Sequence, residues 1–129
     1  MDAMTVAATV SLTDLHNDIS GTDGPFIRED GRQVARIWLR NGYGASVLEE
    51  GPDAWEVLVI REIADNRPHW GGETPWIADY STPATPARDA WDKSPTLHGQ
   101  TVDQVESVLR VLSELPDNDP RDMRARYAV

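Results

Sequence analysis

Two strand-like runs that meet at Asn41-Gly42 constrain the fold of this chain more than any other feature. In RQVARIWLR, residues 32–40, apolar and polar positions alternate as in a half-buried β-strand. Asn41-Gly42 follows at once, and both residues tolerate the positive φ that a tight hairpin turn requires. YGASVLEE, residues 43–50, then returns as a second strand. The segment therefore predicts a β-hairpin.

The tetrapeptide Asn41-Gly42-Tyr43-Gly44 is predicted to be a structural turn and not a binding loop. It lacks the third glycine and the following helix of a dinucleotide-binding loop. Gly42 is expected to supply positive φ, and Gly44 to mark either a bulge or a close approach of the backbone. Tyr43 is expected to pack across the sheet toward Trp38 or its neighbours.

Two further strands are predicted after this hairpin. Gly51-Pro52-Asp53 is a typical turn sequence, and AWEVLVIREI, residues 54–63, is the most apolar and β-branched segment of the chain. We expect it to be the central strand. TPWIADY, residues 74–80, is predicted as a fourth strand whose proline is confined to its beginning or to an edge. These strands predict an antiparallel meander.

The clearest helical signal covers residues 101–115. Thr101 and Gln104 form a capping box at its start, and Pro116 prevents continuation at its end. Since such a helix can cover one face of a sheet, the predicted fold class is α+β: about four antiparallel strands covered on one face by a C-terminal amphipathic helix, in a two-layer sandwich. The helix stripe comprises Val102, Val105, Val108, Leu109, Leu112 and Leu115. It is expected to pack against Ile37, Leu39, Val57, Val59 and Ile63.

The predicted domain organisation has three parts. Residues 1–30 are expected to form a partly flexible N-terminal arm, in which Leu12, Leu15 and Ile19 favour a short helix capped by Ser11 or Thr13. Residues 31–116 are expected to form a single α+β domain, which includes a long connection over residues 81–99. Residues 117–129 are predicted to be a charged tail.

The charge balance bears on the kind of partner. Twelve Lys and Arg stand against 22 Asp and Glu, a formal net charge of −10. An acidic surface repels phosphates, so direct binding to nucleic acid is not expected. Two interpretations remain open. The acidity either serves solubility, or forms a nucleic-acid-mimicking surface that inhibits a basic host DNA-binding or defence protein, with carboxylates spaced like phosphates on one face.

Cysteine usage and hydropathy further limit the chemistry and the cellular location that this chain can have. The chain has no cysteine, which excludes disulfides, thiolate chemistry and cysteine-ligated zinc. The N-terminus lacks the basic segment and apolar core of a signal peptide, and no stretch approaches the roughly 20 apolar residues that span a bilayer. These features predict a cytoplasmic protein that does not enter the membrane.

Local catalytic signatures are absent: the chain contains no GxSxG, GxxxxGK[ST], HExxH or GxGxxG. Glu49 and Glu50 point to opposite faces of a strand, so they cannot act as a catalytic pair. We therefore expect a protein that is not an enzyme, with no cofactor and no metal. The alternative is a small metal-dependent hydrolase that uses His69, Glu73, Asp79 and His98.

The order of these pieces resembles a group of small, mostly uncharacterised proteins encoded by bacteriophages and prophages. The pieces are NGYGASV, matching an NGYGxSV hairpin; WEVLVI, matching a YEVAV-like strand; DYSTPAT, matching a YDTP-like segment; and the final helix. The chain departs from that pattern at Trp55, at Ser81 and in a long insertion before the helix. The resemblance implies a phage-type accessory protein in the cytoplasm of the bacterial host.

The tryptophans indicate where such a protein would make contact. Five tryptophans are present, and Trp38 and Trp55 lie within predicted strands, where core packing is favoured. PHWGGETPW presents two others at the tip of a loop, where they either cover the second face of the sheet or form a contact surface, since tryptophan is enriched in interface hot spots. The leading hypothesis is a non-catalytic protein that binds a host or phage protein. Pairing of two copies through an edge strand is compatible with it. The predicted contact residues are Trp70, Glu73, Trp76 and Trp91.

Overall fold

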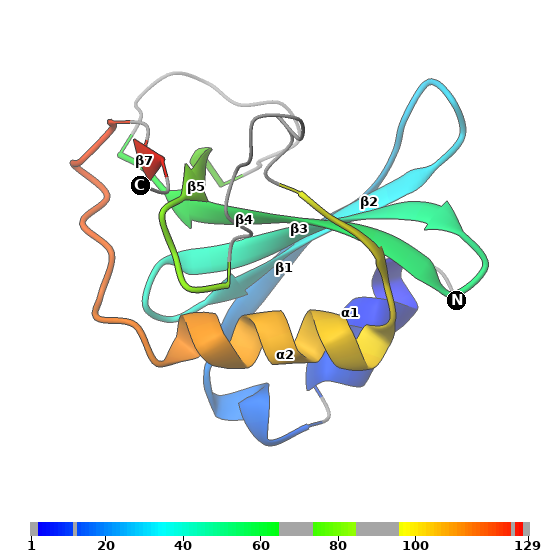
Figure 1. Ribbon diagram of the computed structural model, residues 1–129, viewed down its shortest axis with the longest axis horizontal. Coiled ribbons are helices and arrows are strands. Elements are labelled where there is room, and N and C mark those ends of the chain that lie inside the picture. Colours follow the sequence, from blue (N-terminus) through cyan, green and yellow to red (C-terminus); the bar gives the residue numbers. More distant parts are fainter. Residues whose placement is uncertain (1–2, 12, 65–73, 85–95, 125, 128–129) are drawn as a thin grey trace.

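The computed structural model describes residues 3–11, 13–64, 74–84, 96–124 and 126–127 (Figure 1). In chain order the elements are helix α1 (Ala3–Ser11), 3-10 helix η1 (Asp14–Asn17), strands β1 (Ile19–Ile27), β2 (Gln33–Leu39), β3 (Tyr43–Gly51), β4 (Ala54–Glu62), β5 (Trp76–Tyr80) and β6 (Leu97–Gln100), helix α2 (Val102–Ser113) and strand β7 (Arg126–Tyr127).

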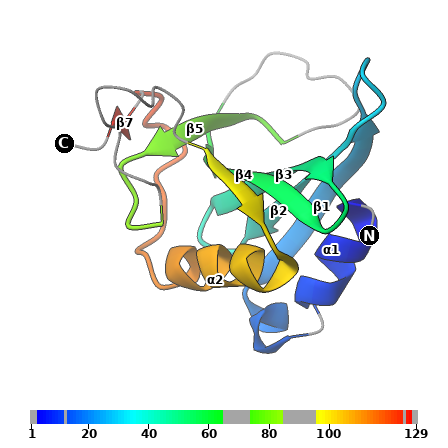
Figure 2. The ribbon, with the colours of Figure 1, turned by 45° about the vertical axis from the view of Figure 1, so that its right-hand side comes forward.

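The described strands form one curved sheet in the order β1-β2-β3-β4-β5-β7, and β6 pairs with β4 off this path. Every pair is antiparallel except β5 with β7. Strand β4 is central, as predicted. One edge of β4 pairs with β3. The opposite edge is shared by two strands, because β6 pairs with residues near Trp55 and β5 pairs near Arg61 (Figure 2). The predicted α+β class and antiparallel meander are confirmed, in a larger sheet than the four strands expected.

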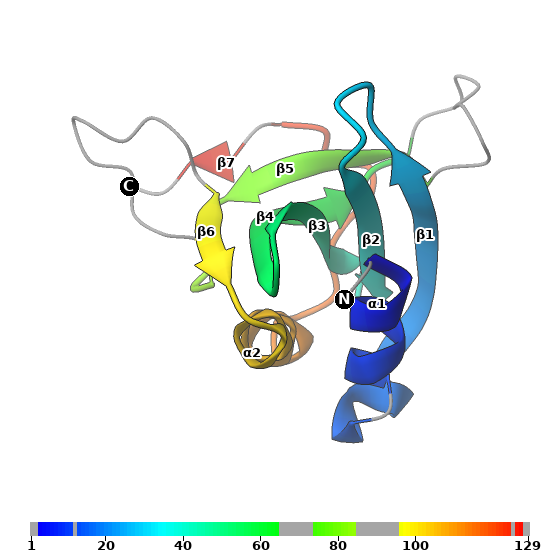
Figure 3. The same cartoon turned by 90° about the vertical axis from the view of Figure 1, so that its right-hand side faces the viewer.

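Both helices lie on the same side of the sheet, along the open side of its curve (Figure 3). The predicted stripe of α2 is confirmed: four of its side chains are buried, and Val102 and Leu115 pack against them. The predicted capping box is also present, since Thr101 Oγ1 accepts from Gln104 N and Gln104 Oε1 accepts from Thr101 N. Ile63 lies beyond the end of β4 and is half-buried. The sheet side of the core comprises Ala35, Ile37, Leu39, Tyr43, Ala45, Val47, Trp55, Val57 and Val59.

The N-terminal segment contains the predicted short helix, as η1 with Thr13 as its N-cap, but it is packed into the core and does not form a loose arm. The described residues between 3 and 27 form α1, η1 and β1, and the α1 side chains Ala3, Val6, Ala7 and Val10 are buried in the same core as α2. The sequence hides this helix because AMTVAATVS has no charged face and contains β-branched residues of modest helix propensity. Its small side chains allow close packing on the sheet, and this tertiary contact decides its conformation.

The segment after α2, predicted as a charged tail, is tied to the sheet by backbone and amide contacts. Asn118 N donates to the carbonyl of Asn41 (2.8 Å), and Asn118 Nδ2 donates to the carbonyl of Glu62 (2.8 Å). Ala64 N donates to the carbonyl of Pro120 (2.6 Å). A hydropathy pattern carries no signal for such contacts, because they use main-chain groups and the side-chain amide of Asn118.

A buried ion pair holds the same segment farther along. Arg61 and Asp79 are both fully buried, and Arg61 Nε lies 3.3 Å from Asp79 Oδ2. The two terminal guanidinium nitrogens of Arg61 donate to the carbonyls of Asp122 and Arg124. Asp79 Oδ1 accepts from Ser81 N (2.9 Å) and from Ser81 Oγ (2.6 Å). One side chain of β4 therefore joins β5 to the C-terminal segment.

Candidate functional site

An arginine held between two aromatic rings marks the sheet face opposite the helices. The alternation along β2 that sends Ile37 into the core places Arg36 on this other face. The Arg36 guanidinium carbon lies 4.9 Å from the centre of the Trp76 ring and 5.4 Å from that of Phe26. Contacts of this kind are cation–π interactions, which order the long arginine side chain. All three residues are half-buried.

Asp23 of β1 lies opposite Arg36 in the strand pairing and binds two residues close to this cluster in the chain. Its Oδ2 accepts from Trp38 Nε1 and from Thr74 N, both at 2.9 Å, so it fixes the Trp38 ring and the approach of the chain to β5. Burial lowers the pKa of Arg36, and the charge of Asp23 opposes that shift. Arginine nevertheless keeps its charge in proteins. We call Phe26, Arg36 and Trp76 the aromatic–arginine cluster.

Only part of the predicted contact surface falls on described residues. Trp76 is the first residue of β5 and belongs to the aromatic–arginine cluster. Trp70, Glu73 and Trp91 lie outside the described residues. Arg36 was not among the predicted contact residues. The sequence feature that could have indicated Arg36 is its position on the polar face of a predicted strand, two residues from Trp38.

The predicted hairpin is present, and its loop has one more residue than expected. Trp38 pairs with Gly44, and Gly42 N donates to the carbonyl of Leu39 (3.1 Å), so residues 40–42 form the loop. Gly42 has φ +87°, whereas Asn41 does not adopt positive φ. This arrangement is typical of a three-residue hairpin loop with glycine in the left-handed region.

The two residues after this loop serve the packing of the sheet. A Cβ on Gly44 would lie 2.6 Å from the Ile37 carbonyl oxygen and 2.9 Å from Trp38 Cε3, so the predicted close approach is present, and the pairing of β2 with β3 has no bulge. Tyr43 is buried in the core on the helix side. Trp38 lies over Gly44 on the other face, so Tyr43 does not pack toward Trp38 itself; it shares the core with Ile37 and Leu39, the neighbours of Trp38 in β2.

Asn41 joins the hairpin to the end of α2. Its Nδ2 donates to the carbonyls of Leu112 (2.8 Å) and Leu115 (3.1 Å), and its Oδ1 accepts from Tyr43 N (3.3 Å). The side chain thereby satisfies carbonyls that the end of a helix leaves without partners. Asn41 thus joins the hairpin loop to the end of α2 through contacts between residues more than 70 positions apart, which local sequence patterns do not reveal.

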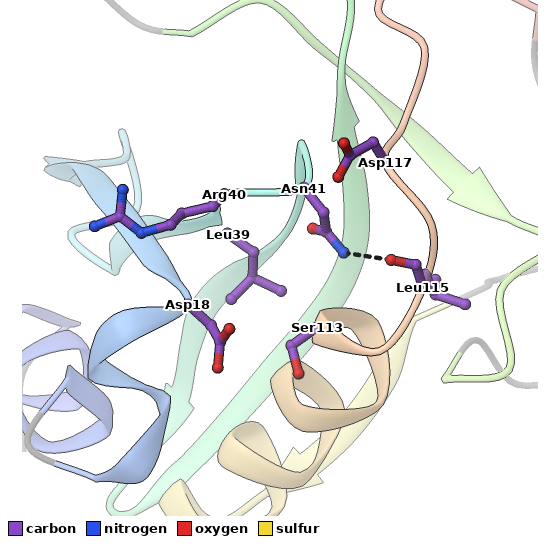
Figure 4. A pocket seen from close by; sticks show the side chains of 7 residues that line it. All are labelled: Asp18, Leu39, Arg40, Asn41, Ser113, Leu115 and Asp117. Atoms are coloured by element: carbon purple, nitrogen blue, oxygen red, sulfur yellow. Dashed lines mark hydrogen bonds between the residues drawn. The ribbon is translucent and has the colours of Figure 1, made fainter.

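A polar cavity of about 250 Å³ lies at this junction (Figure 4). Asp18 and Asp117 contribute carboxylates to it, and the C-terminal end of α2 adds partial negative charge. Arg40 extends away, and its Nε donates to the carbonyl of Asn17 (2.7 Å). The electrostatic field in this cavity therefore favours the binding of a positively charged group. The lining comprises Asp18, Leu39, Arg40, Asn41, Ser113, Leu115 and Asp117.

Replacing Asn41 by alanine is expected to lower the free energy of unfolding by about 2 kcal/mol, because three hydrogen bonds are lost at about 0.5–1.5 kcal/mol each. Asn41→Asp should cost at least as much, since it would turn a carboxylate toward two helix carbonyls. Urea unfolding measures both. The control is Asn17→Ala, at an exposed residue of η1, expected within about 0.5 kcal/mol of wild type. Equal stability of Asn41→Ala and Asn17→Ala would contradict the capping role.

The described half of the predicted hydrolase set does not converge on one ion. Asp79 is buried against Arg61, whereas His98 is exposed on β6 and contacts Glu50 through Nδ1 (3.1 Å). His69 and Glu73 lie outside the described residues. The N–H of Gly99, and then His98, lower the pKa of Glu50.

Acidic residues are interleaved with arginines over the described surface. Arg110 pairs with both Asp14 and Glu106, and these bonds raise the pKa of Arg110. The hydrogen bond from Arg110 likewise lowers the pKa of Asp14. Such pairing breaks up a continuous array of carboxylates, which a phosphate-like surface would need. Three further pairs join residues two positions apart: Asp30–Arg32, Asp119–Arg121 and Asp122–Arg124.

Strand β1, at one edge of the sheet, is poorly suited to pair with a second copy. Its register against β2 shifts between Ile19 and Gly21 and again between Asp23 and Phe26. Pro25 within it has no N–H to donate. Irregular, proline-containing edges discourage strand addition.

A scan against protein-family models and searches of curated proteins and of solved structures found no match to this chain. Neither described helix is long and apolar enough to cross a membrane.

Proposed function

We propose that this chain is a non-catalytic accessory protein of phage or prophage type that acts by binding another protein, with the aromatic–arginine cluster at the centre of the contact. The observation that carries the proposal is the stacking of Arg36 between Phe26 and Trp76. Tryptophan and arginine are the residues most enriched in interface hot spots. Because the stack already orders the Arg36 side chain, binding would cost little further side-chain entropy.

The surroundings of the cluster support the same role. The Asp23 contacts hold Trp38, which is two residues from Arg36, and Thr74, which is two residues from Trp76, while Phe26 and Trp76 remain half-buried and keep part of their surface in solvent. Rigid aromatic groups of this kind supply large contact area. Trp70 and Glu73, which are also predicted contact residues, precede Trp76 closely in the sequence.

The test is affinity capture from a bacterial host lysate with the tagged full chain, followed by purification of the captured protein and calorimetric measurement of its Kd. Trp76→Ala is expected to weaken that Kd by about 30-fold, the effect of a hot spot worth about 2 kcal/mol. Arg36→Lys should also weaken it, since an ammonium keeps the charge but cannot stack as a planar group.

The matched control is Val111→Ser on the outer side of α2, at a residue that is 38% exposed. This variant should bind as wild type does. Circular dichroism and thermal unfolding verify that each variant is folded. Failure to capture any protein above a tag-only sample, or equal Kd values for wild type and Trp76→Ala, would contradict the proposal.

A further inference from the structure

Three side chains with metal-binding atoms converge at the end of the β3–β4 hairpin. Glu50 lies near the end of β3, Glu56 in β4 and His98 in β6. One ligand atom from each lies within 4.8 Å of the other two. They come together because β6 pairs with the first half of β4, which brings residues about 40 positions apart in sequence onto one corner of the sheet.

Groups outside this trio hold two of its members in place. Gly99 N donates to Glu50 Oε1 (2.9 Å), which leaves Oε2 directed toward His98. Gly99 has φ +64°, a conformation that glycine adopts without strain. Thr96 Oγ1 lies 2.9 Å from His98 Nε2, so the imidazole is anchored through one nitrogen while Nδ1 faces the carboxylates. Metal-binding histidines are typically anchored in this way.

The spacing and donor types fit a divalent transition metal. His98 Nδ1 and Glu50 Oε2 lie 3.1 Å apart. Two ligands of a tetrahedral zinc ion, each at about 2.0–2.2 Å from the metal, are separated by roughly 3.3 Å. One imidazole with two carboxylates suits zinc, whereas magnesium and calcium favour oxygen ligands alone.

We propose that Glu50, Glu56 and His98 bind a divalent transition-metal ion, with zinc as the best fit, and that water completes the coordination. The ion would join the end of the β3–β4 hairpin to β6, the strand that leads into α2. This site shares no residue with the aromatic–arginine cluster and does not depend on the proposed protein binding.

Isothermal titration of the full chain with zinc chloride tests the site. Wild type is expected to bind zinc with a micromolar Kd and to give no heat with magnesium chloride. His98→Ala and Glu56→Gln should each weaken zinc binding at least about 10-fold, because each removes one ligand or its charge. His16→Ala, at an exposed histidine in η1, is the matched control and should bind as wild type does.

Two independent readouts accompany the titration. Zinc at about 100 times its Kd should raise the Tm of wild type by several degrees, and this rise should be lost in His98→Ala. Zinc should also shift the ring resonances of His98 in the NMR spectrum of wild type, which requires no variant. Absence of zinc binding, unchanged affinity in both ligand variants, or an unshifted His98 ring would overturn the proposal.

Discussion

Replacing Arg61 by leucine is expected to lower the free energy of unfolding by about 3–5 kcal/mol, the usual cost of removing one partner of a buried ion pair. Arg61 and Asp79 are fully buried, so the substitution would leave the Asp79 carboxylate in the interior without this cation. It would also remove the donors to the carbonyls of Asp122 and Arg124. Urea unfolding followed by tryptophan fluorescence measures the loss.

The matched control is Arg32→Leu, which breaks the exposed ion pair with Asp30 and should cost no more than about 1 kcal/mol. The double variant Arg61→Leu with Asp79→Leu should recover part of the loss, because it removes the buried charge as well. A cost for Arg61→Leu as small as that for Arg32→Leu would show that this pair does not hold the C-terminal segment.

Replacing Val6 by aspartate is expected to lower the free energy of unfolding by at least about 4 kcal/mol and to leave much of the chain unfolded. Val6 is fully buried between α1 and the rest of the core. Burial of a valine side chain is worth about 1.5–3 kcal/mol, and placing an unpaired charge there costs several more. Thermal unfolding by circular dichroism provides the measurement.

Met4→Asp is the control for this prediction, since Met4 lies on the same helix and is 48% exposed. It should change stability by no more than about 0.5 kcal/mol. Comparing these two variants shows whether the N-terminal segment is a core helix or a loose arm. If residues 1–30 acted as an arm, Val6→Asp and Met4→Asp would have the same small effect.

Local patterns predicted those parts of the fold whose signals lie within a few residues. The hairpin at Gly42 and the capping box at Thr101 are present because turn geometry and cap hydrogen bonds depend on near neighbours. Helix α1 was not predicted because its apolar residues are small and the helix has no charged face opposite them. The alternation of apolar and polar positions along its sequence therefore carries little information. Strand β6 was missed for a related reason, since Leu97–Gln100 is short and contains glycine.

The residues of the candidate sites were harder to predict from the sequence than the fold was. Trp76 was singled out from composition, but its partner Arg36 lies 40 positions earlier and is brought near by strand pairing. The same holds for Glu50 and His98, which meet only because β6 pairs with β4. Asp79 was considered as a metal ligand, yet the structure assigns it to Arg61, a choice that its type and spacing do not reveal.

The sequence by itself determined the central hairpins, the strand character of β2–β5 and the amphipathic helix α2, because alternation, turn residues and caps act locally. Only the tertiary structure decided that the N-terminal segment is a core helix and an edge strand, and that the C-terminal segment is held by Asn118 and Arg61. Those outcomes depend on contacts between residues far apart in the chain. Such contacts stabilise the two segments only once the sheet has formed. The glycine-flanked Tyr43 accordingly belongs to the core, while the proposed protein contact lies on the opposite face of the sheet and the proposed metal site lies at the corner of β3, β4 and β6.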